Sequence, residues 1–272
     1  MQQLSGMDAS FVYFETANAP GHIFSVWIYD QSSAPGGKAT FKGILDHVER
    51  RLHVSRTFRQ RLVEVPLGLD HPYWIEDPDF DLEYHVRHIA LPRPGDWRQF
   101  CIQVARLHSR PLDRSKPLWE MYVIEGLDNI AGLPAGSFAI MTKIHHAAID
   151  GVTLLEITSA LNDTSPDAPA PAATGEWRPE RLPTTLELLS RAAVNTAVRP
   201  MRLARLTAST VPGNAERIRE QQARRNFDLG GASAAPRTRF SGTVTTHRVI
   251  EARRFDLATA KAIKAAVPGA TI

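Results

Sequence analysis

The segment that most constrains this chain is the run Lys143–Gly151 (KIHHAAIDG), which joins a predicted strand to a predicted helix. Residues 137–144 (SFAIMTKI) form an apolar run typical of a strand, and residues 152–161 have the spacing of an amphipathic helix. His145 and His146 therefore stand at the end of a rigid element, where one of them can be aimed into a cleft. Histidine exchanges a proton near neutral pH, which favours a general base at this position.

The two histidines are expected to have different roles. Adjacent strand residues point to opposite faces, so His145 and His146 are poorly placed to share a metal ion, and we expect no metal. One histidine can face a cleft while the other packs behind it. Asp150 follows His146 too closely to orient it, so its carboxylate is expected to fix the turn, and Gly151 permits the backbone conformation. On the residues alone, a purely structural histidine pair is an equal alternative.

Other classes of function lack their sequence signals. The chain has 272 residues, 43% hydrophobic and 22% charged, which is typical of a globular protein. It contains no Gly-x-Ser-x-Gly elbow, no phosphate-binding glycine loop, and no lysine-interleaved aromatics that would indicate a nucleic-acid partner. Its single cysteine, Cys101, excludes an intramolecular disulfide and is expected to be packed in a helix. No bilayer-length apolar run and no signal peptide are evident, so we expect a cytoplasmic protein.

The pattern of strands and helices predicts a mixed sheet with helices packed on it. The predicted strands are 23–29, 73–75, 84–91, 119–124, 137–144 and 243–250. The first predicted helix begins at Phe41, with Thr40 as its N-cap. The other predicted helices span 97–109, 152–161, 185–206, 215–225 and 257–267, and Asp256 caps the last of them. The composition becomes rich in proline after Asp163, which predicts a linker or an extended surface crossover there.

The chain resembles a known family at several separate motifs. HHAAIDG resembles the HHxxxDG motif of CoA-dependent acyltransferases such as chloramphenicol acetyltransferase and peptide-synthetase condensation domains. The surrounding residues resemble, more narrowly, the bacterial wax ester synthase/diacylglycerol acyltransferases. The matching segments, in the family's order, are Leu4–Phe11 (LSGMDASF), Asp79–Val86 (DFDLEYHV), Leu91–Gly95 (LPRPG), Pro111–Glu120 (PLDRSKPLWE) and Ala235–Gly242 (APRTRFSG).

This resemblance implies an α/β (α+β) mixed sheet with flanking helices, one half of a chloramphenicol-acetyltransferase-like fold of two subdomains. It also implies a first subdomain (1–163) that carries the HHxxxDG motif, a Pro-rich linker with a basic helical crossover (164–240) and the start of a truncated second subdomain (241–272). It implies acyl transfer from a long-chain acyl-CoA to diacylglycerol or a fatty alcohol, with acyl-CoA as substrate and no cofactor. His146 would be the general base, with His145 and Asp150 holding the geometry and Gly151 allowing the turn. The PLW residues Pro117, Leu118 and Trp119 would line the acyl chain or support the structure, with plain strand packing as the alternative.

This chain differs from the family pattern at its C-terminal end. In the family, the segment like Gly269–Ile272 continues into an Asn-Asp motif and a second subdomain that completes the reaction tunnel. We therefore expect this chain to be an N-terminal half that needs a missing C-terminal partner, and to be a poor, self-associating catalyst alone. Two alternatives remain: a non-catalytic lipid-binding half-protein, and a condensation-type enzyme that uses carrier-protein thioesters.

A basic segment points to a lipid surface. Between Arg191 and Arg205 the chain has four arginines, no acidic residue and several apolar side chains, including Val194 and Val198. Such a segment favours peripheral attachment to an anionic surface such as the inner membrane or a lipid droplet. The alternative is an amphipathic helix packed on its own domain.

Overall fold

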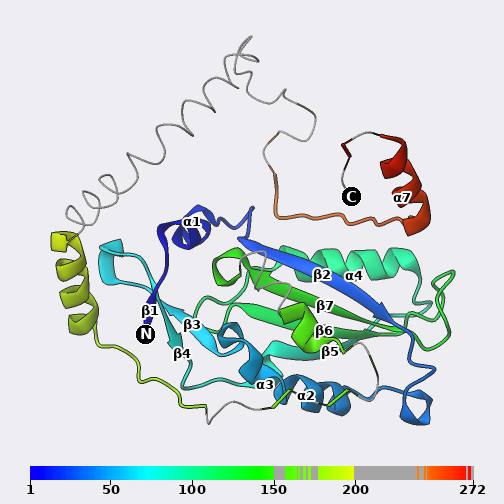
Figure 1. Cartoon of the computed structure of the whole chain (residues 1–272), viewed down its shortest axis with the longest axis horizontal. Helices are drawn as coiled ribbons and strands as arrows, with labels where there is room; N and C mark the ends of the chain where they lie inside the picture. The colour runs from blue at the N-terminus through cyan, green and yellow to red at the C-terminus, as the bar shows by residue number, and fades with distance from the viewer. Residues whose placement is uncertain are drawn as a thin grey trace.

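The structure, a computed structural model, describes residues 1–149, 157–163, 177–198 and 244–267, together with positions 165, 168, 169, 171, 172, 238, 242, 269 and 270. The described part centres on one four-stranded sheet, with a smaller sheet and a peripheral helix beside it (Figure 1). This arrangement confirms the expected mixed sheet with flanking helices.

The main sheet has the strand order β2-β7-β6-β5. Its strands are β2 (His22–Tyr29), β7 (Phe138–His145), β6 (Trp119–Glu125) and β5 (Val86–Ala90). β7 pairs antiparallel with both β2 and β6, while β5 and β6 are parallel, so the sheet is mixed. β7 is an inner strand of the sheet, hydrogen-bonded on both sides, and the histidine pair lies at its C-terminal end.

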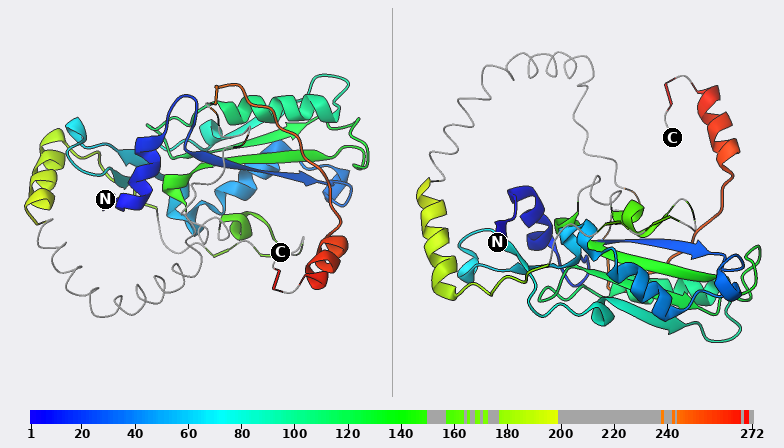
Figure 2. Two further views of the ribbon diagram at one scale, coloured as in Figure 1. Left: turned by 90° about the horizontal axis from the view of Figure 1, so that it is seen from above. Right: turned by 60° about the horizontal axis from the view of Figure 1, so that its bottom comes forward.

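Helices cover the two faces of this sheet (Figures 1 and 2). α2 (Phe41–Glu49) packs on one face and α4 (Trp97–Ser109) on the other. Strand alternation assigns the side chains to these faces. The α2 side contains Val48, Trp119, Met121, Val123 and Ile144. The α4 side contains Phe100, Val104, Tyr122, Ile124 and Met141.

Local signals explain where both helices begin. Thr40 accepts a hydrogen bond from the Gly43 N–H at 3.1 Å, which confirms the predicted N-cap of α2. Asp96 caps α4 and forms a capping box with Gln99, whose side chain returns to the Asp96 backbone. α4 spans the residues predicted for it, and Cys101 is buried within it, as expected.

A smaller antiparallel sheet has the order β1-β4-β3, with β1 (Gln2–Gln3), β4 (Tyr73–Glu76) and β3 (Gln60–Val63). Residues 185–198 form a helix that packs against it through Leu188 and Ala192. The remaining described helices are α1 (Gly6–Phe14), α3 (Leu82–His85), a helix at 157–161 and α7 (Leu257–Ala266). Short 3₁₀ turns occupy Pro35–Gly37, Leu52–Val54, Arg56–Phe58, Pro66–Gly68 and His146–Ala148.

Two predicted strands are wrong in part. The strand expected at 84–91 begins only at Val86, because Asp81 caps the short helix α3 and draws Tyr84 and His85 into it. The strand expected at 243–250 is not formed across 244–250, which runs unpaired beside α4 (Figure 1). There, polar side chains replace a strand ladder: the Trp97 Nε1–H donates to Glu251 at 2.7 Å.

The C-terminal helix is confirmed. α7 starts after Asp256, which accepts a hydrogen bond from the Thr259 N–H at 2.8 Å. None of its residues is buried, and it lies apart from the main sheet (Figure 2). The predicted helix at 215–225 and the end of the one at 185–206 lie outside the described residues. Within the described part, no helix has the length and apolar character needed to cross a membrane.

Candidate active site

The histidine pair sits where β7 ends, held by backbone hydrogen bonds from both neighbouring strands. The His145 N–H donates to the Leu118 carbonyl beside β6 at 3.0 Å. The His146 N–H donates to the Gly21 carbonyl, just before β2, at 2.9 Å. These two bonds point to opposite sides, so the backbone of the pair is fixed between two strands before any side chain is considered.

His145 is the buried member of the pair, with its side chain 1% exposed. Its Nδ1 accepts a hydrogen bond from the Ala147 N–H at 3.0 Å, so the neutral ring carries its proton on Nε2. That Nε2 faces the Glu15 carboxylate at 3.7 Å. Burial lowers the pKa of His145, although Glu15 opposes the shift. His145 is therefore a neutral ring that cannot reach an external substrate, which suits the supporting role expected of it.

His146 is the half-buried member of the pair, in the turn beyond the strand. Its ring stacks on Phe11 of α1, with the ring centres 4.9 Å apart and the planes 18° from parallel. α1 is fixed in turn by Ser5, whose hydroxyl caps the helix by accepting from the Asp8 N–H. The LSGMDASF motif thus builds the helix that holds one face of His146 while the ring stays accessible.

The surface around His146 is apolar. Met7, Phe11 and Phe14 follow one another at i, i+4 and i+7, so they share one face of α1. Their exposed fractions are 73%, 36% and 79%. An accessible histidine beside exposed apolar side chains is suited to a substrate with a long hydrocarbon chain.

A buried charge network underlies this end of the sheet. Lys143 is fully buried, and its Nζ donates to the Arg110 carbonyl at 2.7 Å and to Glu120 at 3.2 Å. Glu120 also accepts from the Tyr122 hydroxyl at 2.7 Å, so both charges are compensated. His22, opposite His145 across the two strands, donates from Nε2 to the His108 carbonyl at 2.8 Å. Burial, assisted by the Lys143 charge, lowers the pKa of His22 to about 4.

These buried neutral histidines predict acid sensitivity. In the unfolded chain His22 takes up a proton near its ordinary pKa of about 6.5, whereas in the fold it does so only near about 4. The unfolded state therefore binds more protons between these values, and the free energy of unfolding must fall as the pH is lowered through that window. We expect the melting temperature to drop between pH 6.5 and 4, and the drop to be smaller in His22→Gln. Equal pH profiles for the two proteins would contradict this.

The PLW residues are buried beside the histidine pair and hold its backbone in place. Pro117, Leu118 and Trp119 are all buried, and the Leu118 carbonyl is the acceptor for the His145 N–H. The Trp119 Nε1–H donates to the Phe58 carbonyl at 2.9 Å, and its ring stacks on His85. His85 in turn donates from Nδ1 to the Trp119 carbonyl at 2.7 Å. These contacts favour the structural reading of PLW.

The structure brings together His145, His146 and the PLW segment. Asp150 and Gly151 lie outside the described residues, so their roles stay predictions. Glu15 and Gly21 were missed by sequence reasoning, since neither belongs to a recognisable motif. Glu15 accepts a hydrogen bond from the Gly21 N–H at 3.0 Å and so ties the loop before β2 to the site. Among the described residues, no group of three or more His, Cys, Asp or Glu side chains forms a metal site.

Comparison with known proteins identifies the class and then the family. The paired histidines at the end of β7 begin the sequence HHAAIDG, which resembles the HHxxxDG motif of CoA-dependent acyltransferases. The chain belongs to the wax ester synthase/diacylglycerol acyltransferase family, because residues 4–272 match that family's catalytic-domain model. This confirms the resemblance inferred from the motifs.

Two relatives from Mycobacterium tuberculosis differ in length. The chain is 37% identical over 269 residues to a probable diacylglycerol O-acyltransferase (tgs3), covering 97% of this chain and 95% of that protein. It is also 37% identical over 238 residues to Rv3087, which carries a provisional diacylglycerol O-acyltransferase name. That match covers 88% of this chain and 47% of the relative, so the chain spans about half of its length.

Two solved structures also match parts of the chain. The wax ester synthase/diacylglycerol acyltransferase from Marinobacter aquaeolei VT8 matches with a TM-score of 0.49 and 31% identity, over 61% of this chain and 40% of that one. The first condensation domain of the calcium-dependent antibiotic synthetase matches with a TM-score of 0.46 and 15% identity, over 78% and 47%. We base the family assignment on the sequence match.

Proposed function

We propose that this chain forms the histidine-bearing half of an O-acyltransferase that moves a long-chain acyl group from acyl-CoA to diacylglycerol or a fatty alcohol. The observation that carries the proposal is the difference in burial between the two histidines. His145 is buried and neutral, while His146 stays accessible beside the apolar face of α1. Family membership supports the substrate class.

In the proposed reaction, His146 acts as the general base. An imidazole nitrogen of His146 takes the proton of the acceptor hydroxyl as its oxygen attacks the thioester carbonyl carbon. The C–O ester bond forms, the C–S bond breaks, and the departing CoA sulfur takes the proton from the imidazolium. The reaction needs neither an acyl-enzyme nor a metal. His145 positions the turn through its hydrogen bond from the Ala147 N–H.

The direct test measures the free CoA thiol released from palmitoyl-CoA, with dioleoylglycerol or hexadecanol as the acceptor. Chromatography detects the ester product in the same reactions. We expect acceptor-dependent thiol release when the chain is combined with a complementary second subdomain from a longer relative, and weak release without it. Binding of both substrates with no ester formed under either condition would favour the non-catalytic alternative. Ester formation only from carrier-protein thioesters would favour a condensation-type enzyme.

We also propose that the segment Arg191–Arg205 attaches the protein to an anionic lipid surface. In its described part, helix 185–198 buries Leu188 and Ala192 but leaves Arg191 exposed and Val194 63% exposed. Arg199, Met201, Arg202, Arg205 and Leu206 lie outside the described residues. Insoluble acceptors require work at an interface, which supports the proposal.

The attachment is tested by co-sedimentation with anionic vesicles at low and high salt. Each arginine near an anionic surface contributes about 1 kcal/mol, weakened by salt. We therefore expect binding that salt reduces, and much weaker binding when all four arginines are changed to glutamine. Equal binding of both proteins at both salt concentrations would leave only a surface helix.

A further inference from the structure

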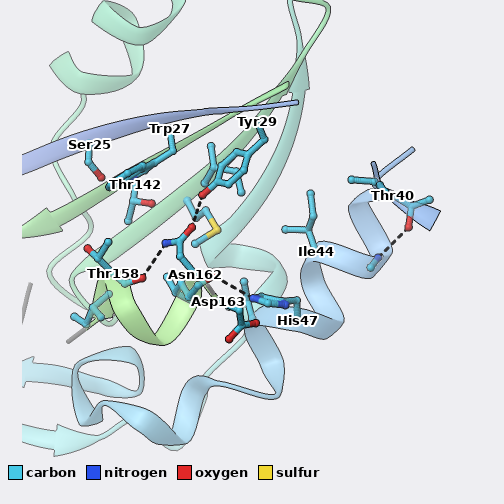
Figure 3. Close-up of a pocket in the computed structure, with 18 of the residues that line it drawn as sticks. Ser25, Trp27, Tyr29, Thr40, Ile44, His47, Thr142, Thr158, Asn162 and Asp163 are labelled. Carbon is cyan, nitrogen blue, oxygen red and sulfur yellow. Dashed lines mark hydrogen bonds between the residues drawn. The ribbon is translucent and has the colours of Figure 1, made fainter. Parts of the chain in front are cut away.

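A largely apolar cavity of about 640 Å³ lies on the α2 face of the main sheet (Figure 3). β2 and β7 form its floor, with Trp27 and Ile144 among the side chains that point into it. Ile44 of α2 and Ile157 of helix 157–161 close its sides. Its volume lies within the range of roughly 300–1,000 Å³ typical of small-molecule sites.

Three polar side chains in the cavity wall, those of Tyr29, Asn162 and His47, have protein partners. The Tyr29 hydroxyl donates to Asn162 at 2.7 Å, and the Asn162 amide donates to the Thr158 carbonyl at 2.8 Å, as Figure 3 shows. His47 bonds the Leu161 carbonyl through Nε2 at 3.1 Å. Because these three side chains are satisfied within the protein, an apolar ligand packed against them leaves none of the three unpaired.

The cavity reaches the strand residue that precedes the histidine pair. Ile144 lines it, and β7 carries His145 directly after Ile144. Ile144 and Ile157 belong to the same core cluster as Ile149, which follows the turn. From Ile140 to Ile144 the strand advances about 13 Å, at about 3.3 Å per residue. A chain lying along this floor from Ile140 to Ile144 therefore ends one residue before His145.

We propose that this cavity holds the single alkyl chain of the acyl donor, with its carbonyl end toward His146; this rests on the function proposed above. At roughly 30 Å³ per non-hydrogen atom, similar to one water in the liquid, the cavity accommodates about twenty atoms. That is enough for one long alkyl chain and too little for the two chains of a diacylglycerol. The volume therefore favours the donor over the diacylglycerol acceptor.

The cavity is tested by binding of cis-parinaric acid, a fluorescent long-chain fatty acid, to the protein. Ser25 points into the cavity from β2, whereas Ile28 lies on the opposite face of the same strand and is 37% exposed. We expect Ser25→Phe to weaken binding roughly tenfold or more, a loss of about 1.4 kcal/mol or more. Ile28→Phe should bind as the unmodified protein does. Equal affinity of the two variants, with both folded, would overturn the proposal.

A second measurement does not depend on a filled cavity. Trp27 lines the cavity, whereas Trp177 lies elsewhere, over Arg59. Trp27→Phe should remove a large part of the energy transfer from tryptophan to the bound probe, and Trp177→Phe should not. The reverse result would place the probe elsewhere and overturn the proposal.

Displacement of the probe identifies the source of the chain. Palmitoyl-CoA should displace cis-parinaric acid from the unmodified protein and from His146→Ala alike. Displacement by hexadecanol or dioleoylglycerol, but not by palmitoyl-CoA, would overturn the donor assignment. The reaction and the cavity can be tested independently of each other. Probe binding with no ester formed would refute the proposed acyl transfer and leave the proposed chain-binding cavity standing. Normal thiol release with unchanged probe affinity in Ser25→Phe would refute the cavity and keep the reaction.

Discussion

Replacing His146 with alanine is expected to lower turnover by roughly 10²–10⁴-fold, the usual contribution of a general base. His146 is the accessible member of the pair, and its neighbour His145 is buried and bonded through Nδ1 to the turn. Among the described residues, His145 is therefore not placed to take over the proton when His146 is lost. Its ring contact with Phe11 lies at the surface of α1, so we expect the fold to remain intact.

The measurement is single-turnover thiol release by the assembled enzyme, with circular dichroism to confirm folding. His247→Ala is the control, since His247 is an exposed histidine in the unpaired segment after residue 243. We expect that control to retain full turnover. Near-normal turnover in a folded His146→Ala protein would remove His146 from the chemistry.

Elements with strong local signals were predictable from the sequence. α4 has an apolar face, a capping aspartate and a stop at Pro111, and its predicted and observed residues agree. β7 was predicted within one residue at each end, because a long apolar run bounded by turn residues has few other outcomes. In both cases the information lies within the element itself.

Elements set by distant contacts were not predictable in the same way. The apolar pattern of 84–91 favoured a single strand, but the Asp81 cap and the stacking of His85 on Trp119 stabilise a helical turn first. The segment 244–250 has strand-forming residues yet finds no partner strand among the described residues. A strand requires a neighbour, and a single sequence does not say which edge is free.

In the candidate site, too, local sequence signals were predictive and contacts between distant residues were not. Strand alternation predicted that one histidine packs while the other can face a cleft, and in the structure His145 is buried and His146 half-buried. Glu15 and Gly21 escaped notice because their contacts arise only when the loop before β2 folds against the end of β7. The Gly21 carbonyl accepts from the His146 N–H, while the Gly21 N–H donates to Glu15. One glycine therefore links the carboxylate facing His145 to the backbone of His146.

This link makes Gly21→Ala the second change with a large expected effect. A methyl group at Gly21 would lie 2.5 Å from Nε2 of His145 and 3.0 Å from the Phe11 carbonyl oxygen. The His145 ring is buried and Phe11 contributes a backbone atom, so neither yields easily. The start of β2 must shift, and its carbonyl moves away from His146. We expect a loss of about 1–3 kcal/mol in unfolding free energy, as in other overpacked sites.

The same shift should also lower turnover, by up to about 10²-fold, because a displacement of about 1 Å misaligns a catalytic group. The matched control is Gly6→Ala in α1, where the new methyl group would lie 3.6 Å from His71, an ordinary contact. Urea unfolding and thiol release are measured for both variants. We expect Gly6→Ala to match the unmodified protein in both. If Gly21→Ala did so as well, close packing at Gly21 would have no part in positioning the histidine pair, and His146 would depend on its contact with Phe11 instead.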